Sequence, residues 1–352
     1  MTTSQSPGPQ LSPRTDTRPD TRPDTQPGDL AVQATGLVKT FGGHRAVDGV
    51  DLEVRRGEVF GVLGPNGAGK TTTLSMLATL LPIDGGEARI LGVDVRREPH
   101  RVRQLIGLTG QYASVDERLT ATENLRLFGR LLGMSRREAR SRAVDLLERF
   151  GLQEAADRPL SGFSGGMRRR LDLAASLLSR PPLIFLDEPT TGLDPRTRGQ
   201  MWDTIRELVA SGCTVLLTTQ YLDEADQLAD RIAVIDHGRK VAEGTPEELK
   251  AAVGSSTLQV RLTDPARTQE AAGLVAGATG QAPTVTPEAG ALNVPLAQAD
   301  AAADVLIALR AAGVSIASAT VAQPTLDEVF LTLTGAPTGA AATDQHENGE
   351  VA

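Results

Sequence analysis

Gly64-Pro65-Asn66-Gly67-Ala68-Gly69-Lys70-Thr71 is the stretch that decides the fold of this chain. It follows the apolar run 59–63 (VFGVL), which predicts a buried strand, and it precedes Leu74, Leu77 and Leu81, which are spaced as one face of a helix. The three glycines allow the backbone to adopt positive φ and to turn its N–H groups inward, so that the loop can wrap a phosphate chain at a helix N-terminus. The stretch therefore predicts a strand, a phosphate-binding loop and a helix, in that order.

The last two residues of this loop carry the chemistry of a nucleotide site. Lys70 is expected to neutralise β- and γ-phosphate charge, and the Thr71 hydroxyl is expected to ligate Mg²⁺. A glycine-rich turn without a ligand is the alternative interpretation, and the flanking strand and helix argue against it. We therefore expect the chain to bind a nucleoside triphosphate.

The composition of the 352 residues restricts the classes of partner. The formal net charge is −8, from 44 acidic and 36 basic residues, and aromatic side chains are few, so we expect no nucleic-acid partner. The single cysteine, Cys213, lies in the apolar run 213–217, which predicts a buried thiol; without a second cysteine for a disulfide, the chain suits a reducing cytoplasm. No run of about eighteen apolar residues and no apolar signal core are present, so any service to a membrane is expected to go through a partner.

The chain is predicted to contain two folded domains between polar tails. Residues 1–29, which include the tandem repeats DTRP, DTRP and DTQP, and residues 336–352 are expected to be disordered. Residues 30–253 are expected to form an α/β domain with a mainly parallel sheet, antiparallel strands near its start and a helical insert at about 115–178. Residues 254–335 predict a small α+β module of the split βαβ type.

Hydrophobic periodicity places the individual elements of these domains. Further strands are predicted near 103–111, 183–188, 214–219, 257–263, 283–287, 291–296 and 314–321, with a hairpin at 231–244. Helices are predicted near 196–211, 222–229, 265–277 and 298–312, with a short one from Thr325. In the insert, Thr120 with Glu123 and Ser135 with Glu138 each fit a capping box at a helix start.

Two carboxylates follow the buried run 183–186 (LIFL). The carboxyl ends of parallel strands are where such sheets bind ligands. Asp187 is therefore expected to hold Mg²⁺, directly or through water, and Glu188 to orient or deprotonate the water that attacks the γ-phosphate. An acidic pair in a solvated loop is the alternative, and the phosphate loop on the same sheet favours the functional interpretation.

A second glycine-rich helix start occurs at Ser164, Gly165 and Gly166. A hydroxyl, bare N–H groups and the helix dipole again make an anion site there, although a plain serine cap is the alternative. Because a helical insert separates this helix start from Lys70, the two need not face the same nucleotide in one molecule. Residues 168–170 (RRR) are expected on a solvated helix face, with a phosphate role as the alternative.

With these motifs in order, residues 30–245 resemble the nucleotide-binding subunit of an ABC transporter. By similarity, 64–71 is the Walker A loop, Gln111 the Q-loop glutamine and 163–167 (FSGGM) the signature; Glu188 ends the Walker B strand as the catalytic base and Asp194 is the D-loop aspartate. The resemblance implies a P-loop NTPase of ABC type, α/β in class, with an antiparallel β subdomain, a helical insert and a small C-terminal α+β module. It also implies a head-to-tail homodimer in which ATP lies between the phosphate loop of one subunit and the signature of the other.

Several positions depart from the commonest pattern of that family, and the signature has Phe163 and Met167 where leucine and glutamine are usual. Phe41 stands where a tyrosine usually stacks on adenine, and it keeps the ring but loses the hydroxyl. Gln220 stands where the family has its switch histidine; its amide can donate a hydrogen bond to the γ-phosphate but cannot carry a proton. A polar turn residue is the alternative interpretation of Gln220.

The resemblance also assigns the site residues. The catalytic residues are expected to be Glu188, Gln220 and Lys70, and the Mg²⁺ ligands Thr71, Gln111 and Asp187. The expected ATP-binding residues are Phe41, Gly64, Pro65, Asn66, Gly67, Ala68, Gly69, Lys70, Thr71, Thr72, Gln111, Ser164, Gly165, Gly166 and Asp194.

Longer segments narrow the resemblance to the daunorubicin/doxorubicin-resistance-type ATPases of drug exporters. These segments are QYASVDE from Gln111, FSGGMRRRLD from Phe163, the run 218–238 and PTLDEVFLTLTG from Pro324. That family implies Mg-ATP hydrolysis that powers export of a drug through a separate membrane permease. The subunit would lie peripherally on the cytoplasmic face of the cell membrane, with residues 112–118 touching the permease. A soluble ABC-type ATPase of DNA repair or translation, and a protein that only binds drug or nucleotide, are the alternatives.

Overall fold

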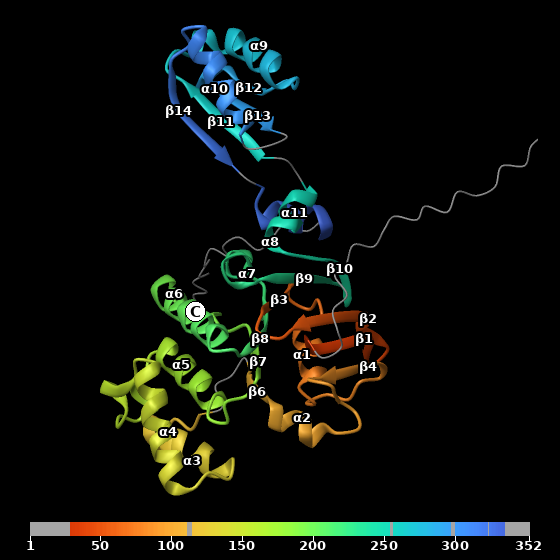
Figure 1. The fold of residues 1–352 in the computed structure, drawn as a ribbon, viewed down its shortest axis with the longest axis vertical. Helices are drawn as coiled ribbons and strands as arrows, with labels where there is room; N and C mark the ends of the chain where they lie inside the picture. The colour runs from red at the N-terminus through yellow and green to blue at the C-terminus, as the bar shows by residue number, and fades with distance from the viewer. Residues whose placement is uncertain (1–28, 111–114, 254–255, 297–299, 323, 335–352) are drawn as a thin grey trace, which may run out of the picture.

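A six-stranded sheet forms the centre of the protein in the computed structural model, which describes residues 29–110, 115–253, 256–296, 300–322 and 324–334 (Figure 1). The strand order is β10-β9-β3-β8-β7-β6, parallel except for the edge strand β10. The strands are β3 (Val59–Leu63), β6 (Ile106–Thr109), β7 (Leu183–Asp187), β8 (Thr214–Thr219), β9 (Arg231–Asp236) and β10 (Arg239–Gly244). Every residue of β3, β7 and β8 is buried, as expected of strands covered on both faces.

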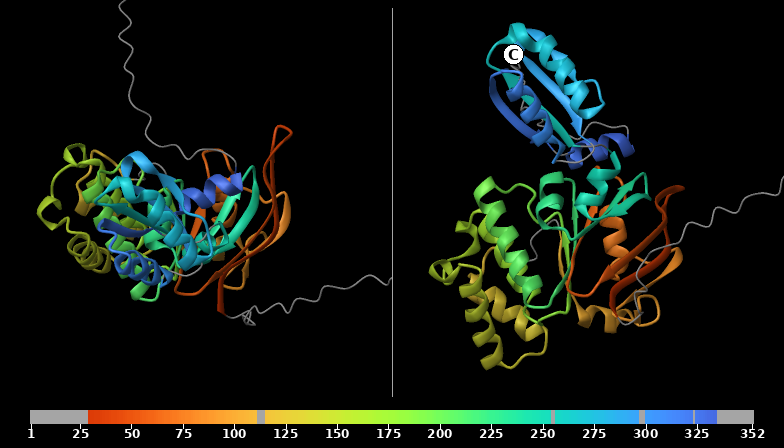
Figure 2. Two further views of the ribbon diagram at one scale, coloured as in Figure 1. Left: turned by 90° about the horizontal axis from the view of Figure 1, so that it is seen from above. Right: turned by 45° about the horizontal axis from the view of Figure 1, so that its top comes forward.

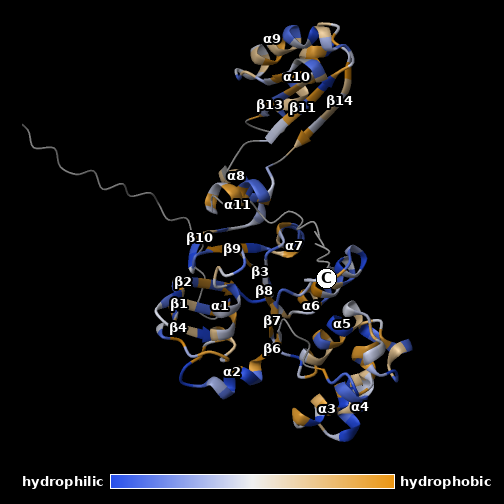
Figure 3. Cartoon of the chain, turned by 180° about the vertical axis from the view of Figure 1, so that it is seen from behind, coloured by the Kyte–Doolittle hydropathy of each residue, from blue (hydrophilic) through white to orange (hydrophobic). Residues whose placement is uncertain are grey.

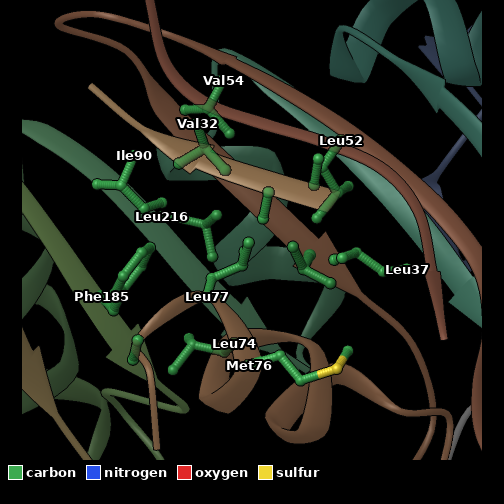
Figure 4. Packing of buried hydrophobic residues seen from close by; sticks show 14 of the residues in the cluster. Val32, Leu37, Leu52, Val54, Leu74, Met76, Leu77, Ile90, Phe185 and Leu216 are labelled. Atoms are coloured by element: carbon green, nitrogen blue, oxygen red, sulfur yellow. The ribbon is translucent and has the colours of Figure 1, made fainter. Parts of the chain in front are cut away.

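A second, antiparallel sheet has the order β2-β1-β4-β5. Its strands are β1 (Leu30–Phe41), β2 (His44–Arg55), β4 (Gly85–Ile90) and β5 (Val93–Asp94). Helix α1 (Lys70–Leu77) packs against both sheets, and Figure 4 shows Leu77 of this helix between Leu52 of the antiparallel sheet and Phe185 of the parallel one, with Leu74 of the same helix below them. The predicted antiparallel β subdomain is therefore confirmed.

Alternation along β7 separates two hydrophobic clusters on the two faces of the parallel sheet. Leu183 and Phe185 face the cluster that contains α1, whereas Ile184 and Leu186 face the cluster that contains helix α5 (Gly165–Ser176). The sheet thus lies between α1 and α5. This arrangement decides where the two glycine-rich helix starts can act.

The predicted helical insert is present. Its helices are α3 (Ala121–Leu131), α4 (Arg136–Arg149) and α5, with short 3₁₀ turns η2 (Gln153–Ala155) and η3 (Leu160–Gly162). Both predicted capping boxes form, with Thr120 capping α3 and Ser135 capping α4. The cassette is completed by helices α6 (Pro195–Ala210), α7 (Leu222–Leu228) and α8 (Pro246–Val253).

The strand predicted at 103–111 is wrong at its start. Residues Pro99–Leu105 form helix α2, and the strand β6 begins only at Ile106. Pro99 occupies the first turn of α2, where its missing N–H would have no helical partner, so the proline was an available signal for a helix start. Gln111, with residues 112–114, lies outside the described residues.

The C-terminal module is a split βαβ fold, as predicted. Four strands pair in the order β12-β13-β11-β14, all antiparallel, and two helices bury one face of the sheet. The elements are β11 (Ser256–Leu262), η4 (Pro265–Arg267), α9 (Thr268–Thr279), β12 (Thr284–Thr286), η5 (Pro287–Ala289), β13 (Ala291–Leu296), α10 (Ala301–Ala311) and β14 (Ile316–Ala322).

Helix α11 (Leu326–Thr334), which the prediction placed in the module of residues 254–335, packs against the cassette. Leu326, Val329 and Phe330 share a hydrophobic cluster with Leu222 of α7 and Leu249 of α8. Figures 1 and 2 show α11 beside α8, while the sheet β11–β14 stands apart from both helices. The chain therefore leaves the cassette after α8 and returns to it in α11. Among the described helices, none is long and apolar enough to cross a membrane.

Cys213, just before β8, is buried, and its Sγ donates to the carbonyl oxygen of Pro181 at 3.4 Å. Burial raises the pKa of this thiol to about 11, because the low-polarity surroundings disfavour the thiolate. At pH 8 the native protein should therefore fail to react with iodoacetamide over an hour, and should react fully once unfolded in guanidinium. Rapid alkylation of the native protein, followed by mass spectrometry, would contradict this expectation.

Candidate functional site

The phosphate loop fits its surroundings only because two of its positions are glycine. A Cβ on Gly64 would lie 2.2 Å from the carbonyl oxygen of Ile235 in β9. Gly69 has φ +103° and caps α1, and a Cβ there would lie 2.3 Å from the carbonyl oxygen of Ala46. Backbone atoms cannot move away as the ends of side chains can. The loop therefore packs so closely against β9 and β2 that no residue with a Cβ fits at these two positions.

Lys70 lies within the curve of this loop, with only 4% of the residue exposed. Its Nζ donates to the carbonyl oxygens of Gly64 at 2.8 Å and Pro65 at 3.2 Å, and lies 3.6 Å from Oε1 of Glu188. Burial lowers the pKa of Lys70, and the nearby carboxylates of Glu188 and Asp187 partly offset that effect. The loop thus brings the ammonium and the Glu188 carboxylate together at the end of the sheet.

Asp187 is bound by two hydroxyl groups. The Thr71 hydroxyl donates to Oδ1 of Asp187 at 3.0 Å, and the Thr218 hydroxyl of β8 donates to the same oxygen. A hydroxyl beside a carboxylate at a phosphate loop is the hard oxygen donor set that Mg²⁺ prefers, so these residues fit that ion. Thr218 was not predicted, and a polar residue on a wholly buried strand was the signal for it.

Glu188 has an unusual backbone conformation for a non-glycine residue. Its φ is +48°, and its N–H donates to the carbonyl oxygen of Thr218 at 3.1 Å. Its side chain is buried at 7% exposure and accepts from the Thr191 hydroxyl at 3.2 Å. Such a left-handed residue costs about 1–3 kcal/mol and persists only where its surroundings hold it, as at functional sites.

Gln220 follows β8 directly and is half-buried. In β8, Thr219 pairs with Leu63 of β3 and Thr218 pairs with Asp187 of β7. Because neighbouring parallel strands end at one edge, Gln220 lies at the same edge as the phosphate loop and the two carboxylates.

Ser164 is the N-cap residue of α5, which lies on the face of the parallel sheet opposite to α1. Its hydroxyl accepts from the N–H of Met167 at 3.2 Å, and the Ser164 side chain is exposed. A Cβ on Gly166 would lie 2.3 Å from Cγ2 of Thr197 in α6, so the start of α5 fits closely against that helix. Asp194 caps α6 through Thr197, and these hydrogen bonds lower the pKa of Asp194.

Phe41 lies at the end of β1 and is 46% exposed. The ammonium of Lys39 lies 5.5 Å from its ring centroid.

The prediction of a solvated face for residues 168–170 is wrong for Arg169 and Arg170. Arg168 pairs with Glu117 at the surface, and Arg170 donates to the carbonyl oxygen of Phe150. Arg169 instead turns its guanidinium inward to main-chain carbonyls beside Glu188. Helical spacing from Leu171 could not show this, because those carbonyls come from other elements.

Together, the phosphate loop between a buried strand and a helix, the carboxylate pair on a nearby strand and the second glycine-rich helix start define the ATPase cassette of an ABC transporter. Residues 47–191 match the ABC transporter family model. Residues 244–334 match the family model of the C-terminal domain of DrrA1-3-like ATP-binding proteins. The protein is therefore an ATP-binding ATPase.

Curated relatives cover nearly the whole chain. The daunorubicin/doxorubicin resistance ATP-binding protein DrrA of Streptomyces peucetius is 55% identical, over 90% of this chain and 96% of its own length. DrrA2 of Streptomyces coeruleorubidus is 50% identical, over 87% and 95%, and DrrA of Mycobacterium tuberculosis is 44% identical, over 88% and 95%. The chain belongs to this family of drug-resistance ABC ATP-binding proteins.

Solved structures match the cassette. The ATP-binding subunit of an ABC transporter gives a TM-score of 0.57 at 29% identity, covering 63% of this chain and 92% of that one. A dimeric, post-hydrolysis ATP-binding cassette bound to ADP and Pi gives 0.56 at 28% identity, covering 61% and 98%. These matches confirm the P-loop NTPase fold of ABC type. ATP-binding subunits of this class dimerise and work with membrane permeases.

Proposed function

We propose that this ATPase powers export of a drug or antibiotic-like compound through a separate membrane permease. The observation that carries the hydrolytic part is the pairing of Lys70 with Glu188 across 3.6 Å at the end of β7. The three relatives described above cover nearly the whole chain and are named as drug-resistance ATP-binding proteins, which supports a drug as the exported compound.

The position of α5 supports a head-to-tail homodimer. The parallel sheet separates α1 from α5, so Lys70 and Ser164 of one molecule serve different nucleotides. A second copy would bring its Ser164, Gly165 and Gly166 to the γ-phosphate held by the first. Asp194 would lie near the interface between the two copies. Residues 64–72 would hold the phosphates, and Phe41 would stack on the adenine.

In the proposed reaction, Lys70 leaves the loop carbonyls to bind the β- and γ-phosphates of ATP. Glu188 accepts a proton from, or orients, the water that attacks the γ-phosphorus in line, and Gln220 donates a hydrogen bond to a γ-phosphate oxygen. Thr71 and Asp187, with Gln111 from the segment outside the described residues, would hold Mg²⁺, which supplies charge neutralisation at the phosphates. Release of the γ-phosphate then removes the group that contacts both subunits of the proposed dimer.

A groove of about 830 Å³ between the insert and the sheet is our proposed docking site for the permease on the cytoplasmic face of the membrane. Leu131 and Leu132 of α3 lie on its rim, and Leu131 is 72% exposed. Figure 3 shows apolar ribbon on α3 at this end of the insert. The groove also includes Gly107 and Leu108 of β6, which precede residues 112–118, our predicted permease contact, in the sequence.

Membrane fractionation tests this proposal. The protein should sediment with membranes only when its permease is co-expressed, and Leu131→Asp should abolish that association while ATP hydrolysis in solution persists. Val144→Asp, which changes an exposed residue of α4 away from the groove, is the matched control. Membrane binding without a permease, or wild-type transport by Leu131→Asp, would contradict the proposed partner and surface.

Gln220→His should introduce a pH-dependent step in the hydrolysis rate near pH ~6.5, because imidazole titrates there and an amide does not. The wild-type rate should lack this step. Steady-state hydrolysis from pH 5.5 to 8.5 measures both, with Gln227→His, an exposed change on α7, as the control. Identical rates and pH profiles for Gln220→His and wild type would remove Gln220 from the site.

A further inference from the structure

The guanidinium of Arg169 donates hydrogen bonds to main-chain carbonyls of two segments, one at the end of β7 and one just after β6. Nε donates to the carbonyl oxygen of Pro189 at 3.0 Å, and Nη2 donates to those of Asp187 at 2.8 Å and Glu188 at 3.0 Å. Nη1 donates to the carbonyl oxygen of Gly110, the residue after β6. One side chain thus holds three consecutive carbonyls at the end of β7, those of residues 187–189, and a fourth from the residue after β6.

We propose that Arg169 is a positioning residue that fixes the left-handed backbone of Glu188 and couples it to the signature helix. Glu188 needs such support, since its φ of +48° is unfavourable for a residue with a side chain. Its N–H is held by Thr218 and its carbonyl by Arg169, so both sides of the residue are fixed. The fixed backbone then holds the Glu188 carboxylate beside Lys70, so the carboxylate does not have to be reoriented before the reaction.

Only arginine suits this position. The four acceptors spread around a planar fork of five N–H donors, which a lysine ammonium cannot span from a single nitrogen. Burial lowers the pKa of Arg169, but Asp172, Asp187, Glu224 and Glu188 oppose that effect, and the guanidinium stays charged at neutral pH.

The same contacts connect the start of α5, at Ser164, to the backbone of Glu188. Arg169 is five residues after Ser164, so about 7.5 Å of rigid helix joins the exposed end of α5 to the carbonyls beside Glu188. Gly166 lies directly against Thr197, so the start of α5 is in close contact with the first turn of α6. If ATP on a second subunit engages Ser164, as the proposed function requires, the displacement of α5 reaches Glu188 of the same chain through Arg169.

Arg169→Lys and Arg169→Gln test the proposal, with Arg168→Lys and Arg170→Lys as matched controls on the same turn. We expect Arg169→Lys to lower kcat about 10²-fold with KM and the Kd for Mg-ATP within about threefold of wild type, and Arg169→Gln to lower kcat further. The two controls should keep kcat within about twofold of wild type. Thermal unfolding is followed for every variant.

A double-mutant cycle separates positioning from general stabilisation. In a Glu188→Gln background the residual single-turnover rate should fall less than about threefold on adding Arg169→Lys, because the residue being positioned has lost its function. An equal loss in both backgrounds, a joint loss of ATP affinity and melting temperature, or an unchanged kcat in Arg169→Lys would each overturn the inference. A wild-type protein that does not hydrolyse ATP would overturn the proposed function itself, whereas an active wild type with active Arg169 variants would overturn only the role of Arg169.

Discussion

Glu188→Gln is expected to lower ATP turnover by about 10²- to 10³-fold while ATP still binds. Glutamine keeps the shape of the side chain and can still accept from the Thr191 hydroxyl, but its amide cannot take a proton from water. The variant also removes the charge 3.6 Å from Lys70, which frees the ammonium for phosphate. Slow hydrolysis should therefore leave the ATP-bound dimer populated, and size-exclusion chromatography in Mg-ATP should detect it.

Glu58→Gln is the matched control for this variant. Glu58 is also a buried carboxylate, and it pairs with Arg231, but it precedes β3 at the opposite edge of the sheet. Its loss should leave kcat within about twofold of wild type. Native turnover by Glu188→Gln, or a comparable loss in both variants, would remove Glu188 from the catalytic role.

Gly64→Ala is expected to abolish measurable ATP binding and to destabilise the protein by about 1–3 kcal/mol, the usual cost of overpacking. The added methyl group would lie 2.2 Å from the carbonyl oxygen of Ile235, so either the loop or β9 has to shift. A shifted loop misplaces the N–H groups that wrap phosphate. Isothermal calorimetry with Mg-ATP and thermal unfolding measure the two effects.

Asn66→Ala in the same loop is the control for stability. The Asn66 side chain is exposed, so its removal should leave the melting temperature within about 2 °C of wild type. A Gly64→Ala protein that melts with wild type and binds ATP normally would mean that the close approach to Ile235 relaxes at no cost.

The sequence was most informative where one residue type is dictated by local backbone geometry. Glycine is required at positions 64 and 69 by close backbone approaches, and both were visible in the motif. The buried strand before Asp187 and the capping boxes of the insert were predictable for a similar reason, because each depends on residues within a few positions of one another.

Features that depend on distant segments were not predictable. The guanidinium of Arg169 is directed by carbonyls 18 to 20 positions away and by Gly110, 59 positions away, and no periodicity encodes that choice. The left-handed backbone of Glu188 likewise depends on a distant residue, because its N–H donates to Thr218 in the neighbouring strand. The packing partner of α11 was equally unpredictable, because its apolar face could have packed on the adjacent module as readily as on α7 and α8.

The return of α11 to the cassette has a consequence for biosynthesis. Leu222 and Leu249 are translated before the helix that covers them, which follows the whole sheet of the C-terminal module. At about 5–20 residues per second, that apolar surface stays open to solvent for several seconds while residues 256–322 are translated. A nascent chain that stalls in this interval presents an uncovered hydrophobic patch to chaperones and proteases, and α11 covers that patch once it packs on α7 and α8.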